Sequence, residues 1–376
     1  MSPMPRPLEG LLVVSLEQAV AAPMASRKLA DAGARVIKLE RPEGDFARGY
    51  DRVAHGQASY FVWLNRGKQS VVTDLSRDDD KRLLEAMVSK ADVFIQNLKP
   101  GALTRLGYPP ERLAALNPRL IQCSISGYGS TGPYVSRKAY DLLIQAEGGL
   151  AAVTGGPEAP SRVGVSVVDI ATGMNAYEAI LEALILRGRT GTGTEIEVSM
   201  FDSVAEWMAV PLLHGEYGSA PKRIGLAHPS VAPYGVFHSA SGTPVLISIQ
   251  NDREWAEFCA HVLGDASLTS DPHFRRNVDR VENRAQTDAI VAKRFAALAT
   301  DKLIGVLNDA DIAFGLVSEV ADVLKHPCLR QISIATPHGP VHVPAPPARI
   351  KGQAPLDTAV PAIGSHSDAV RAEFLG

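Results

Sequence analysis

The chain has 376 residues, of which 45% are hydrophobic and 21% are charged, and its formal net charge is -3 at pH 7. This near-neutral balance, without a basic block, argues against nucleic acid or an anionic membrane as a partner. The cysteines, Cys123, Cys259 and Cys328, are far apart, which argues against a disulfide framework or a thiolate metal site. No stretch approaches the roughly 20 apolar residues of a spanning helix, and the first apolar run is too short for a signal peptide, so we expect a cytoplasmic protein.

Strands and helices alternate through the first half of the chain. Residues 11–16 and 34–40 form apolar, β-rich runs, and between them a helix is predicted from Pro23 to Gly33. The same alternation continues through further predicted helices at 78–91, 141–153 and 169–191 and strands at 92–98, 119–129 and 194–200. Repeated βαβ units of this kind predict an α/β fold with a parallel, doubly wound sheet.

The pattern changes after about residue 215. A connector rich in proline and glycine (218–237) leads to a predicted strand (242–250) and to charged helices within 252–298. We therefore predict a smaller α+β domain over 225–325. The proline-rich tail is expected to run back over the large domain, which would comprise 1–215 together with 326–376.

Several common ligand-binding motifs are missing. The turn after the first strand reads SLEQAVAAP and lacks GxGxxG, which argues against a dinucleotide even though Glu40 stands where an acidic residue would meet a ribose. There is no Walker A sequence, no HExxH or histidine pair, and no GxSxG elbow. The sequence thus gives no support for a P-loop nucleotidase, a metal centre or an α/β hydrolase.

Polar and basic side chains follow the predicted strands where those strands end. They occur in the segments LERPEGD, LNRGKQS, NLKPGALTRLG and SISGYGSTGPY. Ligands of open α/β sheets bind at the carboxyl ends of the strands, and cations there suit phosphates. One such residue alone is more often a solvated surface charge, but four such loops together favour a polyphosphate ligand.

Asp169 follows the apolar run 163–168 and stands at the start of the longest predicted helix. Aspartate is a favoured N-cap, so the local pattern by itself favours a capping role over a catalytic one.

The order of these segments resembles the family III CoA-transferases, which include formyl-CoA:oxalate and carnitine CoA-transferases and the α-methylacyl-CoA racemases. The resemblance covers most of residues 8–210 and returns in the segment PAIGSHSDAV near the C-terminus. It rests on the four strand-end segments above and on AYDLLIQAEGG, VSVVDIATGM and TGTGTEIEVSMFDS.

The resemblance implies that Asp169 is the catalytic nucleophile. It further implies that CoA is bound by Val20, Arg41, Asn65, Lys68, Asn97, Leu98, Lys99 and Arg105, with Tyr128 and Tyr140 lining the acyl end. CoA and acyl-CoA would be substrates, with no permanently bound cofactor and no metal. The implied fold is a Rossmann-like large domain plus a small domain, in an interlocked homodimer whose active site lies near the small domain of the other chain. The chain lacks the glycine run with which some of these transferases cover the intermediate.

The implied reaction moves CoA between carboxylic acids through an aspartyl mixed anhydride and an aspartyl-CoA thioester. One alternative is a racemase-type isomerase, but the histidine that precedes the matching aspartate in that class is replaced here by Tyr140, before Asp141. Another alternative is a non-catalytic CoA-binding protein. The segments resemble most the branch acting on short dicarboxylates, with succinyl-CoA as donor and itaconate, mesaconate or citramalate as acceptor. Arg48, Arg66 and Lys138 are candidates for binding a distal carboxylate.

Overall fold

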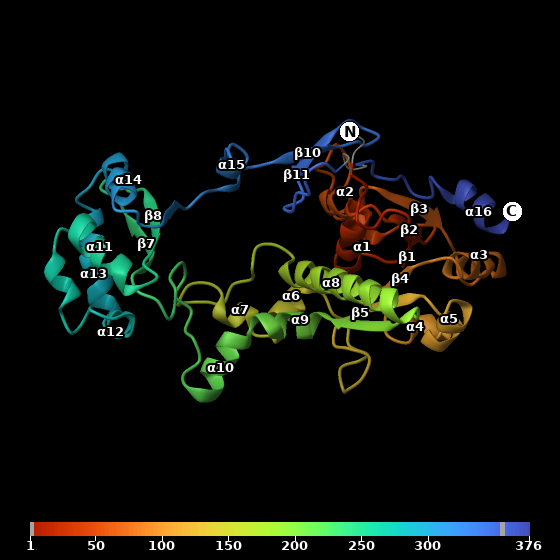
Figure 1. Ribbon diagram of the computed structural model, residues 1–376, viewed down its shortest axis with the longest axis horizontal. Coiled ribbons are helices and arrows are strands. Elements are labelled where there is room, and N and C mark those ends of the chain that lie inside the picture. Colours follow the sequence, from red (N-terminus) through yellow and green to blue (C-terminus); the bar gives the residue numbers. More distant parts are fainter. Residues whose placement is uncertain (1–3, 354–357) are drawn as a thin grey trace. The chain divides into compact units, whose positions relative to one another are not determined.

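A computed structural model describes residues 4–353 and 358–376. The predicted ranges of the large domain also include residues 1–3 and 354–357, which lie outside this description. The described residues form two compact units (Figure 1). The first takes its residues from Met1–Leu150, Val163–Ala209 and Arg330–Gly376, and the second from Ala151–Arg162 and Val210–Leu329.

A six-stranded sheet forms the centre of the first unit. Its strands are all parallel and lie in the order β3 (Lys68–Val72), β2 (Arg35–Glu40), β1 (Leu12–Leu16), β4 (Val93–Gln96), β5 (Ile121–Ser126) and β6 (Glu195–Ser199). The central strands β1 and β4 are mostly apolar, as expected for strands covered on both faces. The predicted parallel α/β sheet is thus confirmed. The chain order reverses between β1 and β4, and ligands of such sheets bind at this switch point.

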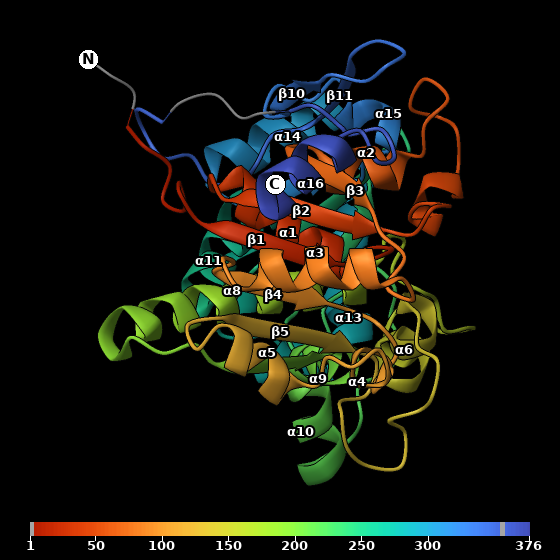
Figure 2. The same ribbon diagram turned by 90° about the vertical axis from the view of Figure 1, so that its right-hand side faces the viewer.

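Helices cover both faces of the sheet. Helices α1 (Ala21–Asp31) and α8 (Val167–Thr190) share one apolar core with the strands, and they pack against each other. The opposite core contains α3 (Asp78–Val88), α5 (Pro110–Leu116) and the C-terminal α16 (Ser367–Leu375), and Figure 2 looks onto this face. Segments from both halves of the chain therefore enclose one sheet.

Short elements complete the first unit. They are the 3-10 turn η1 (Phe46–Gly49), α2 (Ser59–Asn65), α4 (Ala102–Arg105), α6 (Asp141–Glu147), α9 (Met200–Trp207) and the antiparallel pair β10 (Gln331–Ile334) and β11 (Val341–Pro344). Two helices cross the division between the units, α7 (Leu150–Val153) and α10 (Ala209–Tyr217).

The second unit has its own antiparallel sheet of β7 (Tyr234–His238), β8 (Pro244–Ser248) and β9 (Phe314–Leu316). The sheet packs in one apolar core with residues of the flanking helices. These elements are α11 (Asp252–Glu257), the π-helical η2 (Phe258–Leu263), η3 (Ala266–Thr269), α12 (Asn277–Glu282), α13 (Arg284–Phe295), α14 (Thr300–Asp309) and α15 (Val320–Val323). Among the described residues, no helix is long and apolar enough to cross a membrane.

Candidate active site

A cavity of about 320 Å³ lies at the carboxyl ends of β1, β4 and β5, and Asp169 forms part of its wall. It is therefore at the switch point of the sheet, where a ligand is expected. The residues around it come from the loops after these strands, from the segment around η1, and from the starts of α6, α8 and α9. They include Gln18, Ala19, Phe46, Tyr50, Asn97, Leu98, Lys99, Arg137, Lys138, Tyr140, Asp169 and Met200.

Asp169 does not cap α8. The helix begins at Val167, so Asp169 is its third residue, and the residues 163–166 before it are not a strand. The carboxylate of Asp141 instead accepts hydrogen bonds from the backbone N–H groups of Val168 (2.8 Å) and Asp169 (3.2 Å). The capping role that the local sequence favoured for Asp169 is therefore wrong. The carboxylate of Asp141, 28 residues upstream, bonds to the N–H groups at the start of the helix. The side chain of Asp169 is therefore not needed for capping.

The Asp169 carboxyl has an unusual environment. No side-chain hydrogen bond or ion pair to it occurs among the described residues. Burial, and then the nearby negative charge of Asp141, raise its pKa to about 7. An ordinary aspartate would be fully ionised at neutral pH. The pKa of Asp169 is instead close to neutral pH, so that both its protonated and its ionised form are populated there. Because the group is buried, its anion is less solvated and more basic than that of a surface carboxylate.

Asn97 fixes the turn on the other side of the cavity. Its side-chain oxygen accepts the N–H of Gln18 (3.0 Å), and its side-chain nitrogen donates to the carbonyl of Gln18 (2.8 Å). Leu98 and Lys99 follow and line the cavity. The amide of Asn97 is thus occupied with the β1–α1 turn, and it positions residues that face Asp169.

Two further cavities adjoin this one through shared residues. A cavity of about 470 Å³ contains Arg41 and shares Gln18 and Leu98 with the Asp169 cavity. Another, of about 620 Å³, contains Arg105 and shares Leu98 and Lys99. Six of the predicted contact residues therefore lie along one connected set of cavities, namely Arg41, Asn97, Leu98, Lys99, Arg105 and Tyr140.

The structure does not bring the other four predicted contact residues to these cavities. Val20 is buried against Met24 and Leu64. Asn65 and Lys68 are also buried, and the Lys68 ammonium pairs with Glu17 at 2.7 Å. The Tyr128 hydroxyl donates to Glu147 instead. Direct contact of these four side chains with CoA stays a prediction.

Of the candidates for binding a distal carboxylate, only Lys138 lines the Asp169 cavity. Arg48 pairs with Glu40 at 2.7 Å, and Arg66 pairs with Asp31 at 2.7 Å. Lys138 and Lys99 form no ion pair among the described residues, whereas Arg137 is paired with Glu147 at 2.6 Å. The cavity thus offers two cationic side chains without a carboxylate partner.

Sequence reasoning missed Gln18, Tyr50 and Met200 as cavity residues. Tyr50 follows the one-turn helix η1, and its pKa is raised to about 12, first by burial and then by the charge of Asp169. Nothing in its local sequence indicates this position. Gln18 could have been found, because it follows β1 directly, at the expected switch point.

The cavity contains no histidine among its described lining residues. Across the described part of the chain, no group of His, Cys, Asp or Glu has the arrangement of a metal site. The described lining of the cavity thus offers no histidine as one member of an acid and base pair for exchanging an α-proton.

Known proteins share this sequence and architecture. The sequence matches CoA-transferase family III over residues 8–367. An acetyl-CoA:oxalate CoA-transferase of Acetobacter aceti is 37% identical over 350 residues, which are 92% of this chain and 90% of that protein. A succinate–glutarate CoA-transferase of Agrobacterium fabrum is 32% identical, with 98% and 96% covered. A crystal structure of a CAIB/BAIF family protein from Brucella suis has a TM-score of 0.83 at 36% identity and covers 99% of this chain and 100% of that one.

The chain therefore belongs to CoA-transferase family III. It is an enzyme that transfers CoA between acyl-CoA thioesters and carboxylic acids. The class predicted from the ordered sequence segments is confirmed, and the alternative of a non-catalytic CoA-binding protein is set aside.

Proposed function

We propose that Asp169 is the nucleophile that carries first the acyl group and then CoA. The observation that supports this most directly is that the carboxylate of Asp169 lies in the cavity wall without a hydrogen-bonding partner among the described residues, while Asp141 caps its helix. A carboxylate that neither caps nor pairs keeps its lone pairs for attack on a carbonyl.

The reaction would proceed in four displacements. An oxygen of Asp169 attacks the thioester carbon, and CoA leaves as the thiolate, giving a mixed anhydride. The thiolate attacks the aspartyl carbonyl carbon and releases the donor acid, giving aspartyl-CoA. The acceptor carboxylate then displaces the thiolate to form a second anhydride. Finally, the thiolate attacks the acceptor carbonyl, which releases the new thioester and free Asp169.

The expected intermediates can be detected by mass. Wild-type enzyme mixed with succinyl-CoA alone should gain the mass of a CoA thioester on the peptide that contains Asp169. Asp169→Asn should form no adduct and lose transfer, while keeping the same fold by circular dichroism. Normal transfer by Asp169→Asn would reject this role.

The connected cavities suggest how CoA is bound. We propose that the nucleotide end occupies the cavity of Arg41 and that Arg105 meets a phosphate, with the thioester reaching Asp169 past Leu98. Guanidinium groups suit phosphate oxygens because they donate two parallel hydrogen bonds. Arg41→Gln and Arg105→Gln should each raise KM for the acyl-CoA more than they lower kcat.

For the acid substrates we propose short dicarboxylates, with succinyl-CoA as donor and itaconate, mesaconate or citramalate as acceptor. The unpaired Lys99 and Lys138 in the Asp169 cavity support this, because they can bind the carboxylate that does not react. The related enzymes act on oxalate and on glutarate by their names, so these belong in the same panel. Mass spectrometry of CoA esters formed from succinyl-CoA and each acid tests the proposal. Transfer to monocarboxylates only would contradict it.

We further propose a homodimer. Large apolar side chains are exposed on α8 (Met174, Ile185 and Leu186) and on α10 (Val210, Leu212, Leu213 and Tyr217). Exposed large apolar side chains that gather on one helix, as those of α10 do, often mark a protein–protein interface. Light scattering coupled to size-exclusion chromatography should give twice the mass of one chain. A monomer at micromolar concentration would exclude the interlocked arrangement.

A further inference from the structure

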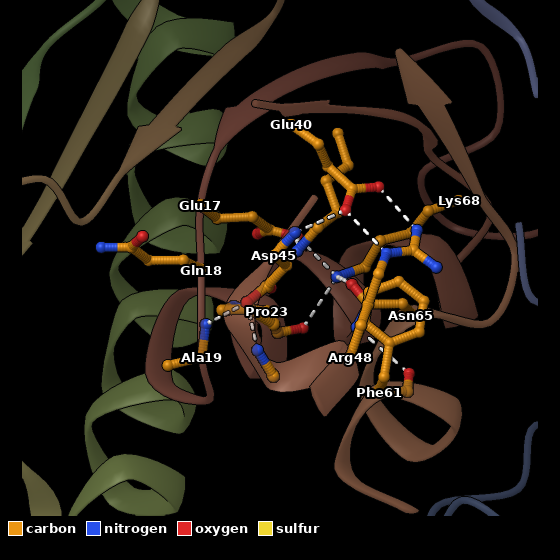
Figure 3. Close-up of polar contacts among 12 residues, drawn as sticks. Glu17, Gln18, Ala19, Pro23, Glu40, Asp45, Arg48, Phe61, Asn65 and Lys68 are labelled. Atoms are coloured by element: carbon orange, nitrogen blue, oxygen red, sulfur yellow. Dashed lines mark hydrogen bonds and ion pairs between the residues drawn. The ribbon is translucent and has the colours of Figure 1, made fainter. Parts of the chain in front are cut away.

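Four charged side chains are buried together beside the β1–α1 turn, and Glu17 and Asp45 among them also line the Arg41 cavity. Figure 3 labels Glu17, Asp45 and Lys68. The side chains of Glu17, Lys38, Asp45 and Lys68 are fully buried. Lys38 Nζ lies 2.7 Å from Asp45 and 3.6 Å from Glu17, and Lys68 Nζ lies 2.7 Å from Glu17. We call these four residues the ion cluster. Its two ammonium groups and two carboxylates balance in charge.

Burying the ion cluster costs free energy, so folding stability alone does not explain it. Removing charges from water costs several kcal/mol per ion, and apolar residues of similar volume are often as stabilising or more so. Burial alone would raise the pKa of Glu17, yet Lys68 and Lys38 hold it well below its usual range, so the carboxylate stays charged. The presence of such a cluster can instead be explained by the backbone segments that it holds in place.

The cluster fixes the turn between β1 and α1. Asp45 Oδ1 accepts hydrogen bonds from the N–H groups of Ala19 (3.1 Å) and Ala47 (2.9 Å). Ala19 has a φ of 64°, a left-handed conformation that is uncommon for a residue with a side chain. Such a conformation persists only where the surroundings hold it, and the hydrogen bond to Asp45 does so here.

The same groups anchor the helix that follows the turn. Glu17 accepts a hydrogen bond from Ser26 of α1 at 2.6 Å, and Lys68 donates to the carbonyl of Pro23 at 3.1 Å and to Asn65 at 3.1 Å. The cluster thus connects the ends of β1 and α2, the first turns of α1, and the segment before η1. Gln18 and Ala19 of the β1–α1 turn line the Asp169 cavity, and so does Tyr50, which follows η1.

We propose that the ion cluster holds the active site in its working geometry. Asp45 is the member of the cluster that holds the β1–α1 turn, through its hydrogen bond to Ala19. The proposal rests on Asp169 being the nucleophile. It also gives a role to Lys68 and Asn65, which are buried beside this turn. These residues act on the reaction through the turn and touch no reacting atom.

Asp45→Ala tests the proposal because it removes the hydrogen bond to Ala19 of the turn, together with the one to Ala47 of η1. Asp45→Asn keeps an oxygen that can accept them but removes the charge. The matched control is Asp92→Ala, because Asp92 likewise pairs with a cationic side chain, that of Arg187 at 2.9 Å, and accepts a backbone N–H, that of Leu12 at 2.8 Å. Asp92 lies in the same unit but precedes β4, at the end of the sheet away from the cavity.

We expect Asp45→Ala to lower kcat roughly ten- to a hundredfold, the size of effect that a displacement of about 1 Å produces, with a smaller change in KM. Asp45→Asn should recover part of this loss. Asp92→Ala should lose thermal stability but keep kcat within about twofold. All rates are measured well below the melting temperature of each variant.

The outcomes separate the two proposals. Equal losses of kcat in Asp45→Ala and Asp92→Ala, or an unchanged kcat in Asp45→Ala, would overturn the positioning role even if Asp169→Asn is inactive. Transfer retained by Asp169→Asn would reject the nucleophile, and a selective loss in Asp45→Ala would still support the positioning of the turn.

Discussion

In the proposed mechanism, the reactivity of the Asp169 carboxylate depends on a second carboxylate, that of Asp141. Asp141 accepts the two backbone N–H groups at the start of α8, and its charge disfavours ionisation of Asp169. The cap and the electrostatic effect come from the same side chain. An amide in place of Asp141 separates them, because it retains an acceptor and loses the charge.

The pH dependence of transfer follows from this arrangement. Only the ionised form of Asp169 can attack a thioester, and burial with the Asp141 charge puts its pKa at about 7. We therefore expect kcat/KM for the acyl-CoA to rise about tenfold per pH unit below 7 and to level off above it. A profile that is flat from pH 5 to 8 would contradict this environment.

Asp141→Asn should move the acid limb of that profile to lower pH. Loss of the neighbouring negative charge favours the ionised form of Asp169, while burial, the larger cause, remains. The limb should therefore stop short of the ordinary aspartate range. Asp141→Ala, which also removes the cap, serves as the comparison and should cost about 1 kcal/mol of stability in addition. An unmoved limb in Asp141→Asn would show that burial alone sets the pKa.

The stability of the fold should also depend on the ionisation of Asp169, and therefore on pH. The pKa of Asp169 is higher in the folded than in the unfolded chain, so the stability associated with its protonated form is complete below about pH 4 and is lost as pH rises through about 7. Asparagine has no proton to lose. We expect Asp169→Asn to raise the free energy of unfolding by about 2 kcal/mol at pH 8, allowing for partial exposure, and to change it little at pH 4. Denaturant titrations at both pH values measure this difference.

Asp169 also marks the limit of sequence reasoning for single residues. The role proposed for Asp169, that of the nucleophile, followed from the order of several segments along the chain. The local pattern assigned the cap of α8 to Asp169, whereas Asp141 makes the capping bonds. Asp141 is 28 residues away, and a local pattern contains no information about such a partner. The resemblance implies that Asn65 and Lys68 contact CoA, which stays a prediction. No local pattern could indicate that Lys68 also bonds to Glu17 and to Asn65 inside the protein.

At the scale of elements, the position of Asp169 depends on how closely α8 approaches α1. Gly173 lies one turn after Asp169, and a Cβ at this position would lie 2.5 Å from the carbonyl oxygen of Ala21 and 2.6 Å from Cβ of Met24. The absence of a side chain lets the first turns of the two helices touch. These turns carry Ala21 and Asp169 to opposite sides of the same cavity.

Gly173→Ala should push the two helices apart and lower both stability and kcat. Overpacking of this kind costs about 1–3 kcal/mol. Gly188→Ala is the matched control in the same helix, because a Cβ there meets no atom within 4 Å. It should be neutral or stabilise by up to about 1 kcal/mol through helix propensity. Thermal melts and steady-state rates of both variants distinguish packing from propensity.

Most elements of the sheet could be predicted because its inner strands are short runs rich in apolar and β-branched residues, and they alternate along the chain with helical segments. The apolar run at 163–166 was less informative. Four apolar or small residues before a long helix resemble a buried strand, yet these residues pair with no neighbouring strand. Periodicity cannot tell such a segment from a loop, because the distinction depends on whether a neighbouring strand is available.

At the scale of the whole molecule, the first unit is closed by residues from the end of the sequence. His366 and Ser367 bond to the backbone of β3 at Ser70 and Val72, and Arg371 pairs with Asp80 of α3. Val370 of α16 is buried in the same core as Leu83, Leu84 and Phe94. Contacts this distant in sequence were expected for the tail in general terms, but no pattern identified the residues that make them.

Val370→Asp should therefore destabilise the first unit strongly, by several kcal/mol, because it puts an unpaired charge into a core. The matched control is Leu375→Asp in the same helix, where the side chain is about half exposed. It should change stability by less than about 0.5 kcal/mol. Equal effects of the two substitutions on the unfolding midpoint would show that α16 is not docked in solution.

The closure of the first unit by residues 330–376 has a consequence for how the protein is made. The ribosome completes the second unit, through Leu329, before it begins the segment that covers β3 and α3. The last strand of the sheet ends at Ser199, about 170 residues before α16 (Ser367–Leu375). At roughly 5–20 residues per second, that face of the sheet therefore lacks α16 for roughly 10–35 seconds after its own strands have been synthesised. During this interval the nascent chain exposes an apolar surface that the finished enzyme hides. The emerging polypeptide is then the form that most needs protection from aggregation.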